Sequence, residues 1–185
     1  PATIDAQEEG SILYVGYTLN LTLEGITFTN GKNTSDGGGA VYCVADDDGY
    51  FANVWARNCV FTLNKGSYGN VSYLGNWYAV DCIFSGNGNA FHGGVAYGGY
   101  WTAVNCVFRN NFAEYNGVFS GNMTATNCIF AYNHASYYCG VGSGALNAIN
   151  CIFYGNSSYM GSIFRGSGFT GKNCIIWGGN NAPFP

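Results

Sequence analysis

The tetrapeptide Asn58-Cys59-Val60-Phe61 is the first of six near-identical copies in this 185-residue chain. The later copies are Asp81-Cys82-Ile83-Phe84, Asn105-Cys106-Val107-Phe108, Asn127-Cys128-Ile129-Phe130, Asn150-Cys151-Ile152-Phe153 and Asn173-Cys174-Ile175-Ile176. Successive cysteines are separated by 23, 24, 22, 23 and 23 residues. A period near 23 is typical of one turn of a solenoid, in which each repeat covers its neighbour and no repeat can bury its apolar face alone.

A second recurring segment lies between the cysteine motifs and indicates how each turn is built. It starts with Gly or Asn and continues as a short apolar run, as in Gly39-Ala40-Val41-Tyr42, Asn70-Val71-Ser72-Tyr73 and Asn116-Gly117-Val118-Phe119. Each turn therefore has a strand after a Gly corner, a strand that enters the Asn-Cys pair, and a strand that carries the Phe. Three strands per turn predict an all-β parallel β-helix, in which the backbone pairs with the coils above and below.

The repeat predicts one domain, 1–185, of about seven to eight coils with about 23 residues each. We expect residues 1–24 to form a first coil and residues 25–58 a longer coil, whose surplus makes a loop at 44–52. Residues 59–173 then form five regular coils, and residues 174–185 a terminal partial coil. We expect the chain to be a mature product or the ordered part of something longer.

The apolar residues of the cysteine motif leave two possible orientations. A strand buries only alternate residues, so three consecutive apolar residues cannot all point inward. If the bend at the Asn shifts the alternation, Cys and Phe face inward and the residue between them faces out; otherwise Cys and Phe face out. The outward column of the first alternative is Val60, Ile83, Val107, Ile129, Ile152 and Ile175. Either alternative leaves an apolar stripe about 25 Å tall, at about 4.8 Å per coil, which indicates an association surface.

Two asparagine columns are interpreted as structural. The first column precedes the cysteines and consists of Asn58, Asp81, Asn105, Asn127, Asn150 and Asn173. Asn tolerates the left-handed conformation that a bend needs, and its amide can bond to the same amide one coil away. The second column closes the following strand and consists of Asn64, Asn87, Asn111, Asn133 and Asn156.

Six of the eight cysteines occupy one position of the coil. They are Cys59, Cys82, Cys106, Cys128, Cys151 and Cys174. This is a stacking pattern, unlike the scattered disulfide framework of small secreted domains. The Cα separation would permit bridges, but in-register side chains point the wrong way for easy ones, so we expect mostly free thiols that behave as small apolar residues. Cys43 and Cys139 lie outside the column, about four coils apart, and should not pair with each other.

Charge and hydropathy exclude two classes of partner. The net charge is −4 and only 9% of residues are charged. Six Lys and Arg residues in total are too few for the clusters that neutralise nucleic-acid phosphates. No run approaches about 18 apolar residues, so we expect no membrane span.

Five Asn-x-Ser/Thr sequons indicate a secreted glycoprotein. They are Asn20, Asn33, Asn70, Asn122 and Asn156. Together they favour an extracellular or cell-surface location with covalent glycans. The alternative is that these residues are ladder and turn asparagines that never carry a glycan.

Several segments carry a family resemblance. They are Leu21-Thr22-Leu23-Glu24-Gly25-Ile26-Thr27-Phe28-Thr29-Asn30-Gly31, Gly37-Gly38-Gly39-Ala40-Val41-Tyr42 and the repeated Asn-Cys-Ile-Phe-x-x-Asn. They resemble the right-handed parallel β-helix proteins of the pectate-lyase-like superfamily, and within it the repeats of the polymorphic-membrane-protein type. In that type the residue after Cys is commonly Thr and faces out, which favours the first orientation and makes Ile or Val there a departure. The resemblance implies a fold but no chemistry, because members include polysaccharide lyases, hydrolases, adhesins and surface-layer proteins.

Catalytic or metal-binding residues are sparse. The only acidic cluster is Asp46-Asp47-Asp48, a weak Ca²⁺ candidate for a lyase-type site; we interpret it as a solvated loop, because consecutive side chains point in different directions. No regular coil pairs two carboxylates as an inverting hydrolase needs. We interpret His92 and His134 as surface or turn residues, neither placed beside a Ser or Cys nucleophile. We therefore expect no cofactor and no enzymatic activity.

The expected function is that of a non-enzymatic extracellular structural protein, whose copies assemble end to end into a fibre or surface layer. Low charge, the apolar column and the lack of an obvious polar cap at either end favour this hypothesis. The alternative is an adhesin or carbohydrate-binding protein, and a Ca²⁺-dependent polysaccharide lyase comes third. Aromatic residues expected at corners or outer faces are Tyr68, Tyr100, Tyr115, Tyr132, Tyr137, Tyr138, Tyr154, Tyr159 and Trp177.

Overall fold

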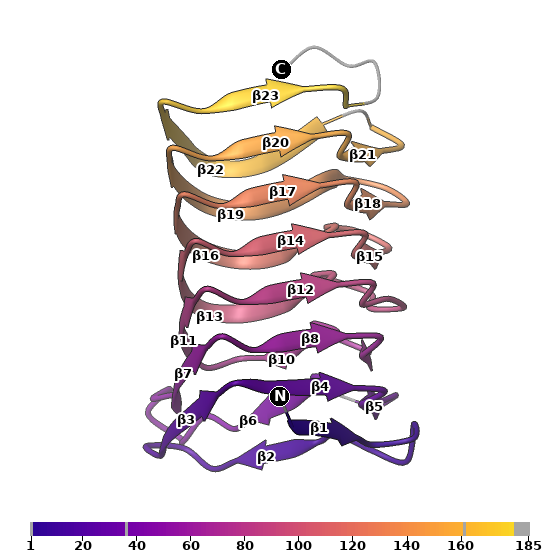
Figure 1. Ribbon diagram of the computed structural model, residues 1–185, viewed down its shortest axis with the longest axis vertical. Coiled ribbons are helices and arrows are strands. Elements are labelled where there is room, and N and C mark those ends of the chain that lie inside the picture. Colours follow the sequence, from indigo (N-terminus) through magenta and orange to yellow (C-terminus); the bar gives the residue numbers. More distant parts are fainter. Residues whose placement is uncertain (1, 36, 161, 180–185) are drawn as a thin grey trace.

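The computed structural model describes residues 2–35, 37–160 and 162–179. Over these residues the chain has strands and turns but no helix, and it forms one domain, a parallel β-solenoid of about seven turns (Figure 1). The nearer strands in Figure 1 run from left to right while the chain climbs, so the solenoid winds as a right-handed coil. The predicted all-β parallel β-helix is therefore confirmed.

One side of the solenoid is an eight-stranded parallel sheet, which we call the front sheet. Its strands are β1 (Ala2–Asp5), β4 (Ile26–Thr29), β8 (Val60–Thr62), β12 (Ile83–Ser85), β14 (Val107–Arg109), β17 (Ile129–Ala131), β20 (Ile152–Tyr154) and β23 (Ile175–Trp177). The strands pair in register, so that Ile83 lies between Val60 and Val107. Residues one period apart in the sequence are thus direct neighbours in space.

A ten-stranded sheet, the rear sheet, bends around the opposite side. Its strands are β2 (Leu13–Val15), β3 (Asn20–Glu24), β6 (Val41–Cys43), β7 (Asn53–Arg57), β10 (Ser72–Tyr73), β11 (Asn76–Val80), β13 (Ala96–Val104), β16 (Phe119–Thr126), β19 (Cys139–Ile149) and β22 (Ser162–Lys172). The first coils have two separate rear strands, as the sequence predicted. From β13 onward the two merge into one strand, so the predicted division is wrong there.

Glycine at the bend explains the merging. Gly121, Gly144 and Gly166 pair with one another on neighbouring strands of the rear sheet. At Gly144 the backbone has φ of +114°, and an added Cβ would collide with the carbonyl oxygen of Gly121. Only glycine fits a backbone that turns the corner so closely against its neighbour, and the strand therefore continues through the bend without a break.

Short side strands complete the coils. They are β5 (Lys32–Asn33) and β9 (Lys65–Gly66), which pair with each other, and β15 (Phe112–Ala113), β18 (His134–Ala135) and β21 (Ser157–Ser158), which form a three-stranded sheet. The last three begin directly after Asn111, Asn133 and Asn156. The later coils therefore have three strands each, as predicted, but one rear strand precedes the Phe strand and the third strand follows it.

The surplus of the long coil lies largely between β6 and β7. Twelve positions separate Val41 from Asn53, whereas four separate their partners Ser72 and Asn76. The extra segment folds back on itself through an antiparallel bridge between Ala45 and Phe51. At the other end of the chain, the expected terminal coil is described through β23 to Gly179, and residues 180–185 lie outside the described residues.

The residues before the cysteines determine which side chains are buried. Asn58, Asp81, Asn105, Asn127, Asn150 and Asn173 all have φ between 52° and 54°. One left-handed residue shifts the alternation between the strand before it and the strand after it. The motif phenylalanines and, except for Cys174, the motif cysteines are consequently at most 1% exposed, and the residue between them faces outward. The first of the two orientations is the correct one.

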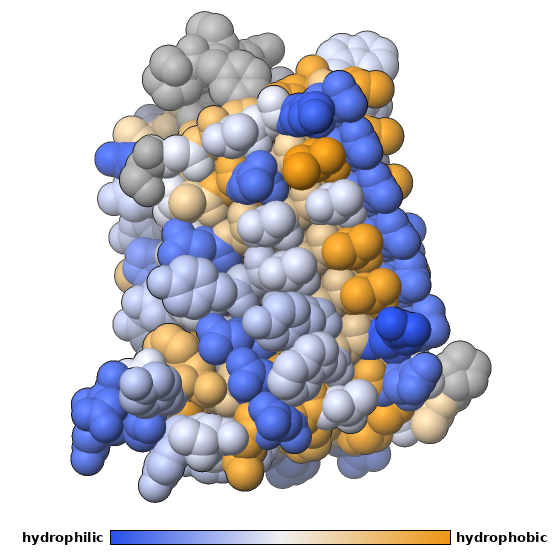
Figure 2. Space-filling model, turned by 90° about the vertical axis from the view of Figure 1, so that its left-hand side faces the viewer, coloured by the Kyte–Doolittle hydropathy of each residue, from blue (hydrophilic) through white to orange (hydrophobic). Residues whose placement is uncertain are grey.

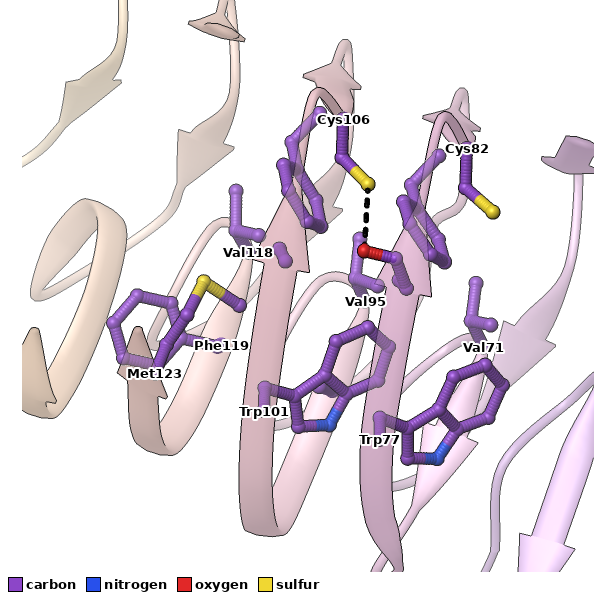
Figure 3. Close-up of a cluster of buried hydrophobic side chains, with 14 of the residues drawn as sticks. Val71, Trp77, Cys82, Val95, Trp101, Cys106, Val118, Phe119 and Met123 are labelled. Atoms are coloured by element: carbon purple, nitrogen blue, oxygen red, sulfur yellow. Dashed lines mark hydrogen bonds between the residues drawn. The ribbon is translucent and has the colours of Figure 1, made fainter. Parts of the chain in front are cut away.

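The core is a column of side chains stacked coil on coil. The inward rings of Phe28, Phe61, Phe84, Phe108, Phe130 and Phe153 stack at centroid distances between 4.8 and 5.1 Å. Trp77 and Trp101 stack at 4.6 Å against the rear sheet (Figure 3). Each buried Phe contributes roughly 2–3 kcal/mol. Because both faces of a ring are covered by neighbouring coils, no coil is stable without the next.

Candidate functional site

The outer face of the front sheet carries a continuous apolar column, which we call the aliphatic ladder. Its members are Val60, Ile83, Val107, Ile129, Ile152 and Ile175. The first three are half-buried, whereas Ile129 and Ile152 are each 39% exposed and Ile175 is 62% exposed. Towards the N-terminus the same column continues with Thr27 and Thr3. The ladder therefore begins at β8 and becomes more exposed towards the C-terminal coils.

A second outward column runs beside the aliphatic ladder. It consists of Thr62, Ser85, Arg109, Ala131, Tyr154 and Trp177. Across strands β8 to β23, Arg109 is the one charged residue in these two columns. The rings of Tyr154 and Trp177 lie 5.8 Å apart at the C-terminal end. The outer face of the front sheet is thus nearly uncharged, and it grades from polar at the N-terminal coils to apolar at the C-terminal coils.

The corner asparagine ladder, the column from Asn58 to Asn173 that precedes the cysteines, borders the aliphatic ladder. Asn105 Nδ2 donates to Asp81 Oδ1 at 3.0 Å, and each later member donates to the one below it at 3.2 to 3.3 Å. These side chains are exposed. The corner column therefore combines a left-handed backbone with a chain of surface hydrogen bonds.

The second column, from Asn64 to Asn156, is the buried asparagine ladder, and its members are at most 1% exposed. Asn111 shows the pattern of the members inside the ladder. Its Nδ2 donates to the Phe84 carbonyl at 3.0 Å and to Asn133 Oδ1 at 2.9 Å, while its Oδ1 accepts hydrogen bonds from the amide and the Nδ2 of Asn87. Every donor and acceptor of the carboxamide is used, so the predicted structural ladder is confirmed.

Burial corrects two of the five glycosylation candidates. Asn70 is 0% and Asn156 1% exposed. Asn70 Nδ2 donates to the carbonyls of Gly94 and Phe112, both at 3.0 Å, and Asn156 Nδ2 donates to the Phe130 carbonyl. A glycan on either nitrogen has no room in this fold, so both predictions are wrong.

The other three sequons lie nearer the surface. Asn20 and Asn122 are exposed, on β3 and β16. Asn33 is half-buried, and its side chain organises a turn by bonding Ser11 and the amides of Ser35 and Gly37. Glycosylation at these three positions stays a prediction, with the geometry most open at Asn20 and Asn122.

All eight cysteines are free thiols. Each member of the cysteine column donates from Sγ to the carbonyl two residues before it, as Cys106 does to Val104 at 3.3 Å. Cys106 also reaches the Ala79 carbonyl on the neighbouring coil at 3.4 Å, the contact drawn in Figure 3. Burial raises the pKa of Cys43 and that of Cys139 to about 12. The thiols of the cysteine column therefore donate to backbone carbonyls, and all the cysteines except Cys174 are buried.

The acidic loop, the weak Ca²⁺ candidate of the sequence, forms a turn that one of its own carboxylates closes. Asp46 Oδ1 accepts hydrogen bonds from the amides of Asp48 and Tyr50, which closes the turn. Residues 2–35, 37–160 and 162–179 contain no group of three or more His, Cys, Asp or Glu side chains that could hold a metal ion. Asp46, Asp47 and Asp48 therefore lie at a hairpin turn, and Ca²⁺ binding there stays a prediction.

One polar pair was missed by sequence reasoning. His134 Nδ1 lies 2.9 Å from the Ser157 hydroxyl, at equivalent positions of β18 and β21. The spacing of 23 residues could have revealed this contact. The His134 ring stacks on Phe112 at 5.7 Å, and the described residues place no carboxylate in hydrogen-bond contact with the imidazole. The pair therefore lacks the third group that orients a catalytic histidine.

Aromatic side chains gather on the corner between the side strands and the rear sheet. The His92 ring is stacked between Tyr68, at 6.0 Å, and Tyr115, at 4.6 Å. Tyr115 also stacks on Tyr137 at 5.4 Å. Rings stacked along the solenoid axis cover one another's faces and turn their edges to solvent. Most of this aromatic corner therefore offers ring edges, and ring faces are open only where the stack is interrupted.

A separate surface with two grooves lies on the side of the molecule seen in Figure 2. A groove of about 410 Å³ lies over the stacked pair of Trp55 and Tyr78 and is also lined by Glu24 and Arg57. A second groove of about 230 Å³ lies beside Tyr100. Figure 2 shows this face as a pale column flanked by orange aliphatic side chains and a blue polar edge. Aromatic, charged and aliphatic groups thus meet on one open surface.

Comparisons with known proteins add no identity to this geometry. No family model, no curated protein and no solved structure matches the chain. The part of the chain that the structure describes contains no helix long and apolar enough to cross a membrane.

Proposed function

We propose that this protein is a non-enzymatic structural protein whose copies associate with one another through the aliphatic ladder. The observation that carries the proposal is the straight, in-register column from Val60 to Ile175, which a single molecule leaves in contact with water. Contiguous apolar surface of this kind marks association sites. Covering it recovers about 25 cal/mol for each Å² of apolar area.

A second copy of the chain is the best-matched partner. Aliphatic side chains on neighbouring strands repeat at about 4.8 Å, and ridges with this spacing fit between ridges of the same spacing. An identical solenoid presents them at the right period over the full height of the ladder. The nearly uncharged surroundings of the ladder keep the cost of removing water from the contact low.

The charge distribution along the solenoid axis favours opposite ends of two copies lying together. Eight of the ten acidic residues fall within the first 48 residues, whereas the sequence after Glu114 has Arg165 and Lys172 and no acidic residue. An antiparallel pair joined by its ladders places acidic coils beside basic ones. Head-to-tail contact between coil ends has the same complementarity, and the two contacts together extend the association into a fibre or layer.

We place this assembly outside the cell or on its surface, with Asn20 and Asn122 as the sequons best exposed for glycans. Within the parallel β-solenoids, we group the chain by its motifs with the pectate-lyase-like superfamily and its polymorphic-membrane-protein type.

The test compares two double variants. One changes two residues of the aliphatic ladder, and the other changes two outward aliphatic residues of the rear sheet. We expect Ile129→Thr with Ile152→Thr to weaken self-association at least tenfold in sedimentation velocity, with the thermal midpoint nearly unchanged. The matched control is Val104→Thr with Ile149→Thr, two half-buried aliphatic residues that face outward on the rear sheet. A wild type that stays monomeric at all concentrations, or equal effects of the two double variants, would contradict the proposal.

A second function, glycan binding, is favoured by one observation, the groove over Trp55 and Tyr78. Two exposed aromatic side chains, Trp55 at 38% and Tyr78 at 42%, lie beside Glu24 and Arg57 and offer apolar contact and hydrogen-bonding groups for a sugar ring. We expect Trp55→Ala to abolish retention on a glycan array, whereas Trp177→Ala, on the front sheet, retains it. Retention that survives Trp55→Ala would exclude this groove.

A further inference from the structure

The aromatic corner contains a depression that is separate from the aliphatic ladder and from the groove over Trp55 and Tyr78. It has a volume of about 300 Å³ and is lined by Ser35, Ser67, Tyr68, Asn89, Phe91 and Glu114. The Phe91 side chain is 44% exposed, the most open ring of this lining. The depression thus combines one available aromatic ring, one carboxylate and several neutral polar groups.

The solenoid brings the carboxylate and the ring together. The Glu114 amide donates to the Ala90 carbonyl, and the next amide, Tyr115, donates to the Phe91 carbonyl. Phe91 and Glu114 therefore occupy equivalent positions on consecutive coils, about 4.8 Å apart along the axis. The Phe91 ring meets His92 edge-on at 5.3 Å and lies tilted against Tyr115 at 4.9 Å. These contacts restrict the position of the ring in the lining that it shares with Glu114.

The carboxylate of Glu114 has no cationic partner in the part of the chain that the structure describes. Among the described residues it forms neither a salt bridge nor a hydrogen bond, and the salt bridges there involve Glu8 with Lys32 and Lys65. The imidazole of His92 packs against Phe91 and Tyr115, and burial lowers its pKa although Glu114 acts in the opposite direction. The imidazole is therefore neutral at neutral pH and leaves the charge of Glu114 uncompensated.

We infer that this depression binds a compact alkylammonium group, held by the Phe91 ring and the Glu114 carboxylate. A ring face attracts an organic cation through its quadrupole, and a neighbouring carboxylate adds charge attraction. A single carboxylate cannot supply the six to eight oxygen ligands that Ca²⁺ takes, and an anion would meet Glu114 with like charge. The same corner already holds one such contact, because the Arg165 guanidinium lies 4.3 Å over the Tyr138 ring.

The experiment is an NMR titration of the full chain with tetramethylammonium chloride, at ionic strength matched with NaCl. We expect saturable shifts around Phe91 and Glu114, and we expect Glu114→Gln and Phe91→Leu each to weaken binding about fivefold. Tyr100→Leu, an exposed ring on the rear sheet outside the depression, is the matched control and retains wild-type affinity. Since Glu114→Gln is nearly isosteric and changes no described hydrogen bond, its circular dichroism should be that of the wild type.

Two further ligands sharpen the result. The neutral isostere 3,3-dimethylbutan-1-ol should not bind, and equal binding of this alcohol would overturn the inference, as would unchanged affinity of both pocket variants. Nα-acetyl-lysine methylamide distinguishes the source of the cation. Binding comparable to that of tetramethylammonium supports a lysine side chain of a protein partner, and binding of tetramethylammonium alone supports a free quaternary ammonium compound.

Discussion

The two asparagine ladders use one residue type at one period for different physical purposes. At the corner, the side chains are exposed and the backbone is left-handed, as at Asn127 with φ of 54°. In the buried ladder, the carboxamide is fully enclosed and each of its polar atoms is bonded, as at Asn111. The corner requires a backbone conformation, whereas the interior requires a particular set of hydrogen-bonding atoms.

Residues that replace Asn within the chain support this distinction. The corner column accepts Asp81 and also Gly25, whose φ is 65° and whose amide bonds to the next coil as the corner asparagines do. The buried ladder has replacements only at its two ends, where the Gly31 amide donates to Asn64 Oδ1 and where Gly179 takes the position of Asn156 one coil further on. Position along the stack therefore decides which substitutions are tolerated.

The largest expected difference in unfolding free energy is between Asn→Asp substitutions in the two ladders, which replace the amide nitrogen with an oxygen. Asn111→Asp removes both Nδ2 hydrogen bonds and places a carboxylate against the Phe84 carbonyl, which we expect to cost on the order of 3–5 kcal/mol of unfolding free energy. The matched change Asn150→Asp, at the exposed corner, should cost less than about 1 kcal/mol. Urea denaturation at pH 7 measures both. Equal losses would show that the two ladders do not differ as described.

Alkaline pH tests whether burial also controls the cysteines, because a buried thiol resists deprotonation more than an exposed one. The folded-state pKa values of Cys43 and Cys139 are raised to about 12 from an ordinary value of 9.0. Stabilisation from keeping each thiol neutral is complete below about pH 9 and is lost as the pH rises towards 12. Between these limits we expect each thiol to cost about 1.4 kcal/mol of unfolding free energy for every pH unit.

The thiol contribution is isolated by comparing pH profiles of variants, because tyrosines and lysines titrate in the same range. Cys43→Ala and Cys139→Ala should each flatten the decline in unfolding free energy between pH 9 and 11. Val41→Ala, which shortens a buried side chain that does not titrate, should lower the unfolding free energy but leave the slope of the wild type. A slope that none of the variants alters would mean that the thiols are not protected by burial.

The smallest expected effects separate backbone from side chain at the corner. Asn127→Gly keeps access to the left-handed conformation and should change the unfolding free energy by about 0.5 kcal/mol or less, whereas Asn127→Val should cost about 1–3 kcal/mol through backbone strain. In the buried ladder, Asn111→Gly should lower the unfolding free energy at least as much as Asn111→Ala. Thermal unfolding of these four variants gives the comparison. Similar losses for both Asn127 variants would assign the corner role to the amide.

Much of the fold was predictable from the sequence because a regular solenoid turns sequence separation into spatial contact. From Cys59 onward the coils have nearly constant length, so counting 22 to 24 residues finds the partner on the next strand. The same counting would have found the contact of His134 with Ser157. It fails in the first coils, where 28 residues separate Leu13 from its partner Val41 and 31 separate Val41 from Ser72.

The sequence by itself determined the period, the stacked core and the two asparagine columns, because each follows from residues that recur at equal spacing. Only the tertiary structure decided the rest. The orientation of the aliphatic ladder depends on a single positive φ at each corner, which Asn permits but does not impose. The burial of Asn70 and Asn156, and the meeting of Phe91 with Glu114, depend on which backbone segments close over them. Such enclosure is a property of the packed coils and of no short stretch of sequence.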